Sequence, residues 1–314
     1  MDRKPVSVKS YANIAIVKYW GKADAERMIP STSSISLTLE NMYTETKLSF
    51  LPEDATSDVM YIDDELQGEK ETTKASKVLD LFRTNPNQHV KIETWNNMPT
   101  AAGLSSSSSG LSALVKAANE LFQVGKTQSE LAQIAKFASG SSSRSFFGPL
   151  AAWDKDSGDV YQVETDLKLA MIMLVLTDQK KPVSSRDGMK LCTETSTSFP
   201  EWIKQSEQDY EDMLGYLKTN DFQAVGELTE ANALRMHQTT STANPPFSYL
   251  TDASYQAMDK VKALRASGEQ CYFTMDAGPN VKVLCLEEDL DRLADHFRKD
   301  YQVIVSRTKE LPDA

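Results

Sequence analysis

The first candidate for a chemical role is a stretch rich in serine and glycine, residues 99–110. The alternating run 89–95 predicts a strand before it, and the spacing of Leu111, Leu114 and Val115 predicts a helix after it. At the start of a helix, backbone N–H groups lack intrahelical partners and carry a positive partial charge. Such a loop binds phosphate without a cationic side chain. A flexible serine linker is the alternative, but linkers are rarely bracketed by a strand and an apolar helix.

A second group contains Lys18 and Lys22, which lie on either side of Tyr19 and a Trp20-Gly21 turn signal. At the end of a strand, the two lysines could reach one anionic ligand from both sides. The alternative is an ordinary strand with solvated lysines and core aromatic residues, and this alternative is the stronger one for the group taken alone.

Two further segments combine small or hydroxyl residues with cations. Residues 139–145 follow an expected helix that Gly140 can end, and Arg144 offers a planar fork for a carboxylate or a phosphate. Residues 180–186 carry Lys180, Lys181 and Arg186 beside two serines. The alternatives are a helix end with a surface arginine for the first segment and a solvated connector for the second.

Asp276 follows the apolar run 272–275 and precedes a Gly-Pro turn. Aspartate commonly forms turns, so a purely local role is the alternative. Its position at the end of a buried-looking strand instead suggests a carboxylate directed into a cleft. The histidines, His89, His237 and His296, have no nucleophile or second metal ligand at a telling spacing, and we expect them to be structural or exposed.

The composition limits the partners of these groups. The chain has 314 residues, 40% hydrophobic and 25% charged, and a net charge of −11, which predicts a soluble globular protein of one large or two medium domains. The negative charge disfavours nucleic acid and anionic membranes as partners. Three cysteines without CxxC spacing predict a reduced, cytoplasmic protein without structural zinc. No signal peptide or bilayer-spanning apolar run is apparent.

The elements that must position these groups mix strands and helices throughout, which predicts an α+β fold with a cleft between two halves. A capping box at residues 127–130 marks the start of one helix. A composition shift at residues 177–187 predicts a boundary, dividing the chain into residues 1–180 and 181–314. Strands are expected at 6–8, 34–39, 44–51, 167–176, 270–275, 281–286 and 303–305, and helices at 104–121, at 127–138 and around 210–217, 258–264 and 290–297.

Several familiar signatures are missing from the sequence. It contains no G-x-x-x-x-G-K-[ST], no HRD or DFG set, no G-x-G-x-x-G and no H-E-x-x-H. If a nucleotide binds, the loop at residues 99–110 is therefore the best place for its phosphates.

Taken together, these groups resemble the GHMP small-molecule kinase superfamily, whose phosphate loop reads Pro-x-x-x-Gly-Leu-Ser-Ser-Ser, here residues 99–107. Within that superfamily the chain is similar to the diphosphomevalonate decarboxylases. Serines 105, 108 and 109 stand where many members carry alanine, and Ser143 replaces a residue that is often cysteine; neither departure removes a charged group. The matching blocks, in family order and over nearly the whole chain, are residues 11–15, 18–22, 30–36, 97–104, 139–141, 144–145 and 276–280.

The resemblance implies an α+β, two-lobed GHMP-kinase-like fold with the active site in the cleft between the lobes. It implies conversion of mevalonate 5-diphosphate, with ATP and Mg²⁺, to isopentenyl diphosphate, ADP, phosphate and carbon dioxide, and it favours a homodimer. ATP would first phosphorylate the tertiary C3 hydroxyl, and departure of that phosphate would drive loss of the neighbouring carboxylate.

The resemblance also implies roles for particular residues. Asp276 would orient the C3 hydroxyl and take or steer its proton, Arg144 would hold the substrate carboxylate, and Lys18 would neutralise charge near the reacting centre. The expected substrate-binding residues are Tyr19, Lys22, Ser139, Gly140, Ser141, Arg144, Ser185 and Arg186. The expected ATP-binding residues are Thr94, Asn97, Pro99, Ala101, Ala102, Gly103, Leu104, Ser105, Ser106, Ser107 and Lys181, with Ser106 near a Mg²⁺ held mainly by the ATP phosphates.

Two other functions stay open on the sequence alone. One is a GHMP kinase that phosphorylates a mevalonate-type alcohol and stops before decarboxylation. The other is a non-catalytic sensor of nucleotide or isoprenoid diphosphate, against which the intact Asp276, Lys18 and Arg144 argue.

Overall fold

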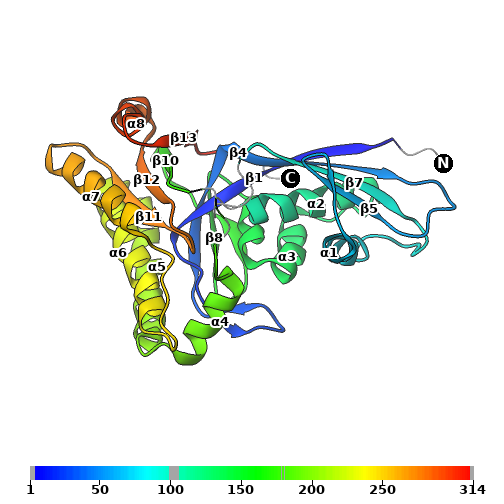
Figure 1. Cartoon of the computed structure of the whole chain (residues 1–314), viewed down its shortest axis with the longest axis horizontal. Helices are drawn as coiled ribbons and strands as arrows, with labels where there is room; N and C mark the ends of the chain where they lie inside the picture. Colours follow the sequence, from blue (N-terminus) through cyan, green and yellow to red (C-terminus); the bar gives the residue numbers. More distant parts are fainter. Residues whose placement is uncertain (1–3, 99–105, 178, 180, 312–314) are drawn as a thin grey trace.

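A computed structural model describes residues 4–98, 106–177, 179 and 181–311 of the chain. Within them, strands and helices mix as an α+β fold built around two sheets that lie side by side (Figure 1). No helix in the described ranges is long and apolar enough to cross a membrane.

The larger sheet has seven strands among the described residues, in the order β6-β5-β7-β4-β8-β9, with β1 also pairing with β4. Its centre is β4, one strand of 17 residues where the sequence pattern suggested two. Glu40 and Asn41 interrupt the apolar alternation, and the β1–β4 register shifts there, but pairing continues on both sides. The strands are β1 (Val6–Val17), β4 (Ser34–Phe50), β5 (Val59–Ile62), β6 (Glu65–Leu66), β7 (Val90–Asn96), β8 (Leu150–Trp153) and β9 (Val160–Gln162), and a small hairpin pairs β2 (Lys22–Asp24) with β3 (Ile29–Pro30).

Helices α1 (Glu69–Leu79), α2 (Ser106–Leu121) and α3 (Gln128–Ala138) pack on one side of this sheet (Figure 1). The apolar stripe expected for α2 is buried against β1 and β4. At the start of α3, Thr127 and Glu130 form the expected capping box, so both helix predictions are confirmed. A 3₁₀ helix, η1 (Gly140–Phe146), begins directly after Ser139 and carries Gly140, Ser141 and Arg144 of the expected group.

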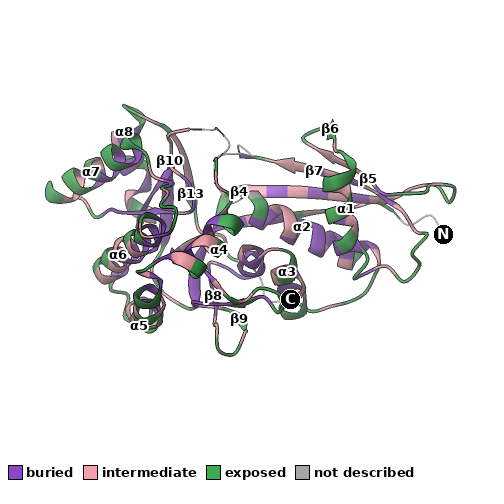
Figure 2. Cartoon of the chain, turned by 60° about the horizontal axis from the view of Figure 1, so that its bottom comes forward, coloured by how far each residue is buried: buried purple, intermediate pink, exposed green. Residues whose placement is uncertain are grey.

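The second sheet is antiparallel, in the order β11-β12-β10-β13. Helices α6, α7 and α8 pack on it. Strands β10, β11 and β12 are largely buried, whereas the helices around them expose their outward faces (Figure 2). The elements are β10 (Leu169–Val175), α4 (Ser185–Thr195), α5 (Phe199–Lys218), α6 (Phe222–Ser241), α7 (Asp252–Ala266), β11 (Tyr272–Met275), β12 (Val281–Leu286), η2 (Glu287–Asp289), α8 (Leu290–Arg298) and β13 (Gln302–Arg307).

Strand β10 explains why its sequence is apolar at every position. Leu169 and Met171 point into a core shared with the seven-stranded sheet, whereas Ala170 and Ile172 point into the core beneath α7 and α8. Both faces of the strand are therefore buried, as expected for a central strand between two layers. The strand belongs to the second sheet although it precedes residue 180, and a domain boundary at that residue stays a prediction.

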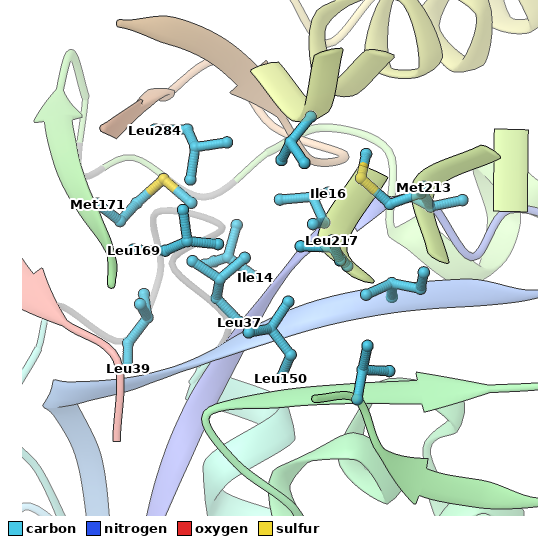
Figure 3. Packing of buried hydrophobic residues seen from close by; sticks show 14 of the residues in the cluster. Ile14, Ile16, Leu37, Leu39, Leu150, Leu169, Met171, Met213, Leu217 and Leu284 are labelled. Atoms are coloured by element: carbon cyan, nitrogen blue, oxygen red, sulfur yellow. The ribbon is translucent and has the colours of Figure 1, made fainter. Parts of the chain in front are cut away.

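The shared core joins the two sheets. Figure 3 shows Ile14 and Leu37 from the larger sheet close to Leu169 and Met171 from β10, with Met213 of α5 on the flank. Interiors packed in this way hold their elements at a fixed separation, because any sliding would open voids. The end of β1 and the β11–β12 turn, which carry Lys18 and Asp276, are thus held in register with each other.

Candidate active site

A cavity of about 300 Å³ opens where the two sheets and several helix ends meet. It lies beside α4, which packs on β2 near the foot of the molecule in Figure 1. Helices α2, η1 and α4 begin at its wall. Because the first N–H groups of a helix lack intrahelical partners, hydrogen-bond donors converge there. Its lining is Asn13, Ala15, Lys18, Tyr19, Trp20, Lys22, Met28, Ser107, Ala138, Ser139, Gly140, Ser141, Arg144, Lys181, Ser185, Arg186, Met189, Met236, Asp276 and Ala277.

The carboxylate of Asp276 lies between two ammonium groups. Lys18 Nζ is 2.8 Å from Oδ1, and Lys282 Nζ is 3.0 Å from Oδ2. Burial alone would raise the pKa of this carboxyl, but the two lysines together hold its pKa well below the ordinary value. Asp276 is therefore ionised at every pH at which the protein is expected to work.

Lys18 is fixed in place from several directions. Its side chain is 2% exposed, and Nζ also donates to the carbonyl of Ala15 at 2.7 Å. Its backbone N–H donates to Oδ1 of Asn232 on α6, whose amide donates in turn to Asp209 on α5. Burial lowers the pKa of Lys18, and the nearby Asp276 charge opposes that shift.

Arg144 lies in η1 with its side chain almost wholly buried. Its Nη1 donates to Ser34 Oγ, its guanidinium carbon is 5.9 Å from the centre of the Tyr19 ring, and its Nε has no hydrogen-bond partner among the described residues. Burial lowers its pKa to about 10, so it stays cationic near neutrality. A buried guanidinium with an unused donor at a cavity wall suits an anionic ligand.

Two hydrogen bonds hold η1 against β1, because Nδ2 of Asn13 donates to the Ser141 carbonyl and to Ser145 Oγ, each at 2.8 Å. Gly140 packs so closely on Tyr19 that an added Cβ would lie 2.9 Å from the ring. The small residues expected from the sequence therefore serve a close backbone approach, which brings the start of η1 to the cavity.

Further cations gather toward α4. Burial and the neighbouring Arg186 charge lower the pKa of Lys22, and burial lowers the pKa of Lys181. Lys181 Nζ donates to Ser185 Oγ at 2.6 Å and to the Ala277 carbonyl at 2.7 Å. Like charges brought together around a cavity favour a ligand with more than one negative charge.

The structure thus brings most of the predicted residues to one cavity. These are Lys18, Tyr19, Lys22, Ser107, Ser139, Gly140, Ser141, Arg144, Lys181, Ser185, Arg186 and Asp276.

The other predicted ATP-binding residues lie elsewhere or outside the described residues. Thr94 is buried in β7 beside the Thr46 hydroxyl at 3.1 Å, and the Asn97 side chain bonds the backbone of Asn41 and Tyr43. Neither lines the cavity, and an ATP role for them stays a prediction. Pro99, Ala101, Ala102, Gly103, Leu104 and Ser105 lie outside the described residues, and Ser106 begins α2, with no description of its side chain.

Sequence reasoning missed Lys282, Asn13 and Trp20 as parts of the site. A signal for Lys282 was present, because it is the charged residue within the otherwise apolar strand β12. His237 was expected to be structural or exposed; it is buried in α6, where burial and the Lys18 charge lower its pKa to about 4, so the ring is neutral.

Comparison with known proteins agrees with this geometry. Residues 10–163 match the family model described as the diphosphomevalonate decarboxylase-like N-terminal domain, and residues 171–312 match the mevalonate 5-diphosphate decarboxylase C-terminal domain. The diphosphomevalonate decarboxylases of Candida albicans and Saccharomyces cerevisiae are 30% and 32% identical to the chain, covering 94% and 91% of it and 88% and 79% of their own lengths.

Solved structures share the whole architecture. A mevalonate pyrophosphate decarboxylase from Streptococcus pyogenes has a TM-score of 0.97 and 68% identity, covering 100% of this chain and 99% of its own. The protein MDDEF, solved in complex with MVAPP, AMPPCP and magnesium, has a TM-score of 0.90 and 40% identity, with 98% of both chains covered. The fold is therefore the two-lobed, GHMP-kinase-like one. On the family models, the relatives and the structures together, this chain belongs to the diphosphomevalonate decarboxylase family.

Proposed function

We propose that the protein converts mevalonate 5-diphosphate and ATP to isopentenyl diphosphate, ADP, phosphate and carbon dioxide. The observation that carries the proposal is the meeting of Asp276, Lys18 and Arg144 at one cavity wall. A carboxylate, an ammonium and a guanidinium at one wall suit a substrate that presents a hydroxyl, a carboxylate and phosphates together.

Asp276 orients the C3 hydroxyl as an ionised hydrogen-bond acceptor. Because Lys18 and Lys282 hold its pKa so low, it is a weak base. Phosphoryl transfer has a loose transition state in which the attacking hydroxyl keeps its proton until late, so positioning matters more than basicity. Lys18 balances the charge that gathers as the phosphoryl group reaches the C3 oxygen.

Arg144 holds the substrate carboxylate opposite the departing phosphate. When the C3–O bond breaks, phosphate leaves with the electron pair and positive charge builds at C3. The bond to the carboxylate carbon then breaks, and its electrons form the alkene while carbon dioxide leaves. A guanidinium held by burial and by Ser34 keeps that carboxylate in line without reorganising during the reaction.

The substrate diphosphate binds among Tyr19, Lys22, Ser139–Ser141 and the first turn of α4 at Ser185 and Arg186. Both η1 and α4 begin there, which adds backbone donors to the cations. Burial raises the pKa of Tyr19 to about 12, so its hydroxyl stays protonated and can donate to a phosphate oxygen.

ATP and Mg²⁺ fit the start of α2, where Ser106 and Ser107 stand at the first helical turn and Ser107 lines the cavity. The described residues form no cluster of three or more His, Cys, Asp or Glu side chains, so phosphate oxygens would supply most metal ligands. Bound Mg²⁺ supplies charge neutralisation between the phosphates. Lys181, beside Asp276, reaches toward the transferred phosphoryl group.

The test offers the purified protein Mg²⁺-ATP with mevalonate, its 5-phosphate and its 5-diphosphate in turn. We expect carbon dioxide and ADP in a ratio of about one with the 5-diphosphate alone, because each turnover consumes one ATP. A ratio near zero with ADP still released identifies a kinase. Tight ATP binding without turnover of any of the three compounds identifies a sensor.

We further propose that the enzyme works as a homodimer in the cytoplasm. All three cysteines, Cys192, Cys271 and Cys285, are buried free thiols, which supports a reducing compartment. The family resemblance supports the dimer, and sedimentation at micromolar concentration tests it.

A further inference from the structure

The β11–β12 hairpin places a second lysine behind the reacting carboxylate. Thr274 pairs with Lys282 and Met275 with Val281, so the turn that begins at Asp276 brings the chain straight back alongside it. Lys282 is fully buried, and its Nζ is 3.0 Å from Asp276 Oδ2. It does not line the cavity. It therefore contacts the catalytic carboxylate from the side that a ligand cannot reach.

Lys18 contacts the same carboxylate from the other lobe. It follows β1, lines the cavity, and lies 2.8 Å from Oδ1. The two ammonium groups are thus unequal, because Lys18 lines the cavity, where phosphates of a bound substrate also attract its charge, whereas Lys282 does not line it.

We propose that Lys282 is a positioning residue for Asp276, which keeps the carboxylate ionised and correctly aimed once Lys18 engages the phosphates of the bound substrates. The proposal rests on the function proposed above.

The electrostatics of a loaded site create the need for such a residue. Bound phosphates carry several negative charges, and like charges nearby raise the pKa of a carboxylate and repel it. Besides the two lysines, the described groups that interact electrostatically with Asp276 include Arg144, Lys181 and the buried His237. Arg144 and Lys181 line the cavity, so a bound anionic ligand also attracts these cations and competes with Asp276 for them.

His237 is neutral, because its pKa is lowered to about 4. Among the described residues, Lys282 is therefore the cation on Asp276 that bound substrate leaves untouched. Its charge is fully buried and little screened by solvent, so its effect persists at physiological salt.

The test replaces Lys282 with methionine, which keeps the chain length and removes the charge. We expect kcat to fall at least ~10-fold while KM for both substrates stays within about threefold, because the contact is with the carboxylate and not with substrate. We also expect the acidic limb of the kcat–pH profile to move up by about one pH unit. Lys282→Gln, which keeps a hydrogen-bond donor without charge, should show the same shift of the limb.

A double-mutant cycle separates positioning from a merely structural role. In the Asp276→Asn background, Lys282→Met should cost no further activity, since the group through which it acts is gone. An additive loss, or an unchanged pH profile in both the methionine and the glutamine variants, overturns the proposal.

Lys116→Met is the control, because Lys116 is another lysine held away from full exposure, whose pKa burial lowers to about 8, and it has no ion pair to Asp276. The pH profile of this variant should follow that of the wild type.

The assay of the wild-type protein distinguishes the failure of the proposed function from the failure of the positioning role. If the wild type releases carbon dioxide and the Lys282 variants match its kcat and pH profile, the positioning role alone is overturned. If the wild type never releases carbon dioxide, the proposed function and the positioning role are both overturned.

Discussion

Replacing Asp276 with asparagine leaves two buried ammonium groups, Lys18 and Lys282, without the carboxylate that lies between them. Asparagine keeps the size of the side chain, so the perturbation is almost purely one of charge. Lys18 is 2% exposed and Lys282 is not exposed at all, so water can replace the lost anion only in small part.

The expected loss of stability follows from the two contacts of 2.8 and 3.0 Å. Removing one partner of a buried ion pair costs about 3–5 kcal/mol, because the other charge stays buried. At roughly 2–4 °C per kcal/mol, the thermal midpoint should fall by about 10 °C. Deprotonation of one lysine limits the cost, so we do not expect twice this value although two pairs are lost. Turnover should fall at least ~10²-fold, the usual scale for a positioned acid–base group.

The sign of the pH dependence follows from Lys18. Burial lowers its pKa and the Asp276 charge opposes that shift, so without Asp276 the pKa of Lys18 in the folded state falls further below its value in the unfolded state. The unfolded chain then binds more protons, so the stability of the variant relative to the wild type rises with pH. The gap in thermal midpoint should be large near neutrality and shrink above about pH 9 as Lys18 loses its proton.

Thermal unfolding followed by circular dichroism across pH, together with carbon dioxide release, measures both effects. The control is Asp156→Asn, since Asp156 pairs with Lys155 at 2.8 Å but its side chain is 83% exposed. Surface pairs of this kind contribute about 0–1 kcal/mol, so the control should melt like the wild type. An Asp276→Asn protein that melts within the error of the control and turns over normally would refute the reasoning.

Two further changes test other parts of the site, and a third tests a buried charge outside it. Gly140→Ala places a Cβ 2.9 Å from the Tyr19 ring. Displacement of the ring should raise KM for the diphosphate substrate about tenfold with little change in the melting temperature. An unchanged KM would contradict the placement of the substrate diphosphate beside Tyr19. Arg144→Gln should lower kcat/KM roughly 10²-fold through lost charged hydrogen bonds, and carbon dioxide release at the wild-type rate would remove the carboxylate contact. Lys116→Met should stabilise the protein below about pH 8, because burial lowers the pKa of Lys116 in the folded state to about 8 from 10.5. The difference in unfolding free energy from the wild type should close toward pH 10.5, and urea melts at several pH values measure that difference.

Local patterns in the sequence were enough to predict many elements, because helices and strands leave their period in the order of apolar residues. The run 281–286 is a strand with the expected bounds, and the helix after the Thr127–Glu130 capping box is present. The residue types also identified most of the cavity wall, since serine, glycine, lysine and arginine in short clusters are what anion binding requires.

The prediction from local pattern was wrong about the extent of β4: the strands expected at 34–39 and 44–51 form one continuous strand. The polar residues Glu40 and Asn41 interrupt the alternation, but long-range pairing with β1, β7 and β8 carries the strand through them. Pairing energy between strands is a tertiary quantity, and no local window contains it.

The sequence by itself determined which groups are present, namely a carboxylate at 276, a lysine at 18 and an arginine at 144. Only the tertiary structure decided that Lys18 meets Asp276 across 258 positions of the chain, and that Lys282 stands behind them as a third charge. The reason is physical: the pKa of a side chain depends on burial and on charges within a few ångströms, and both are set by packing between the two sheets.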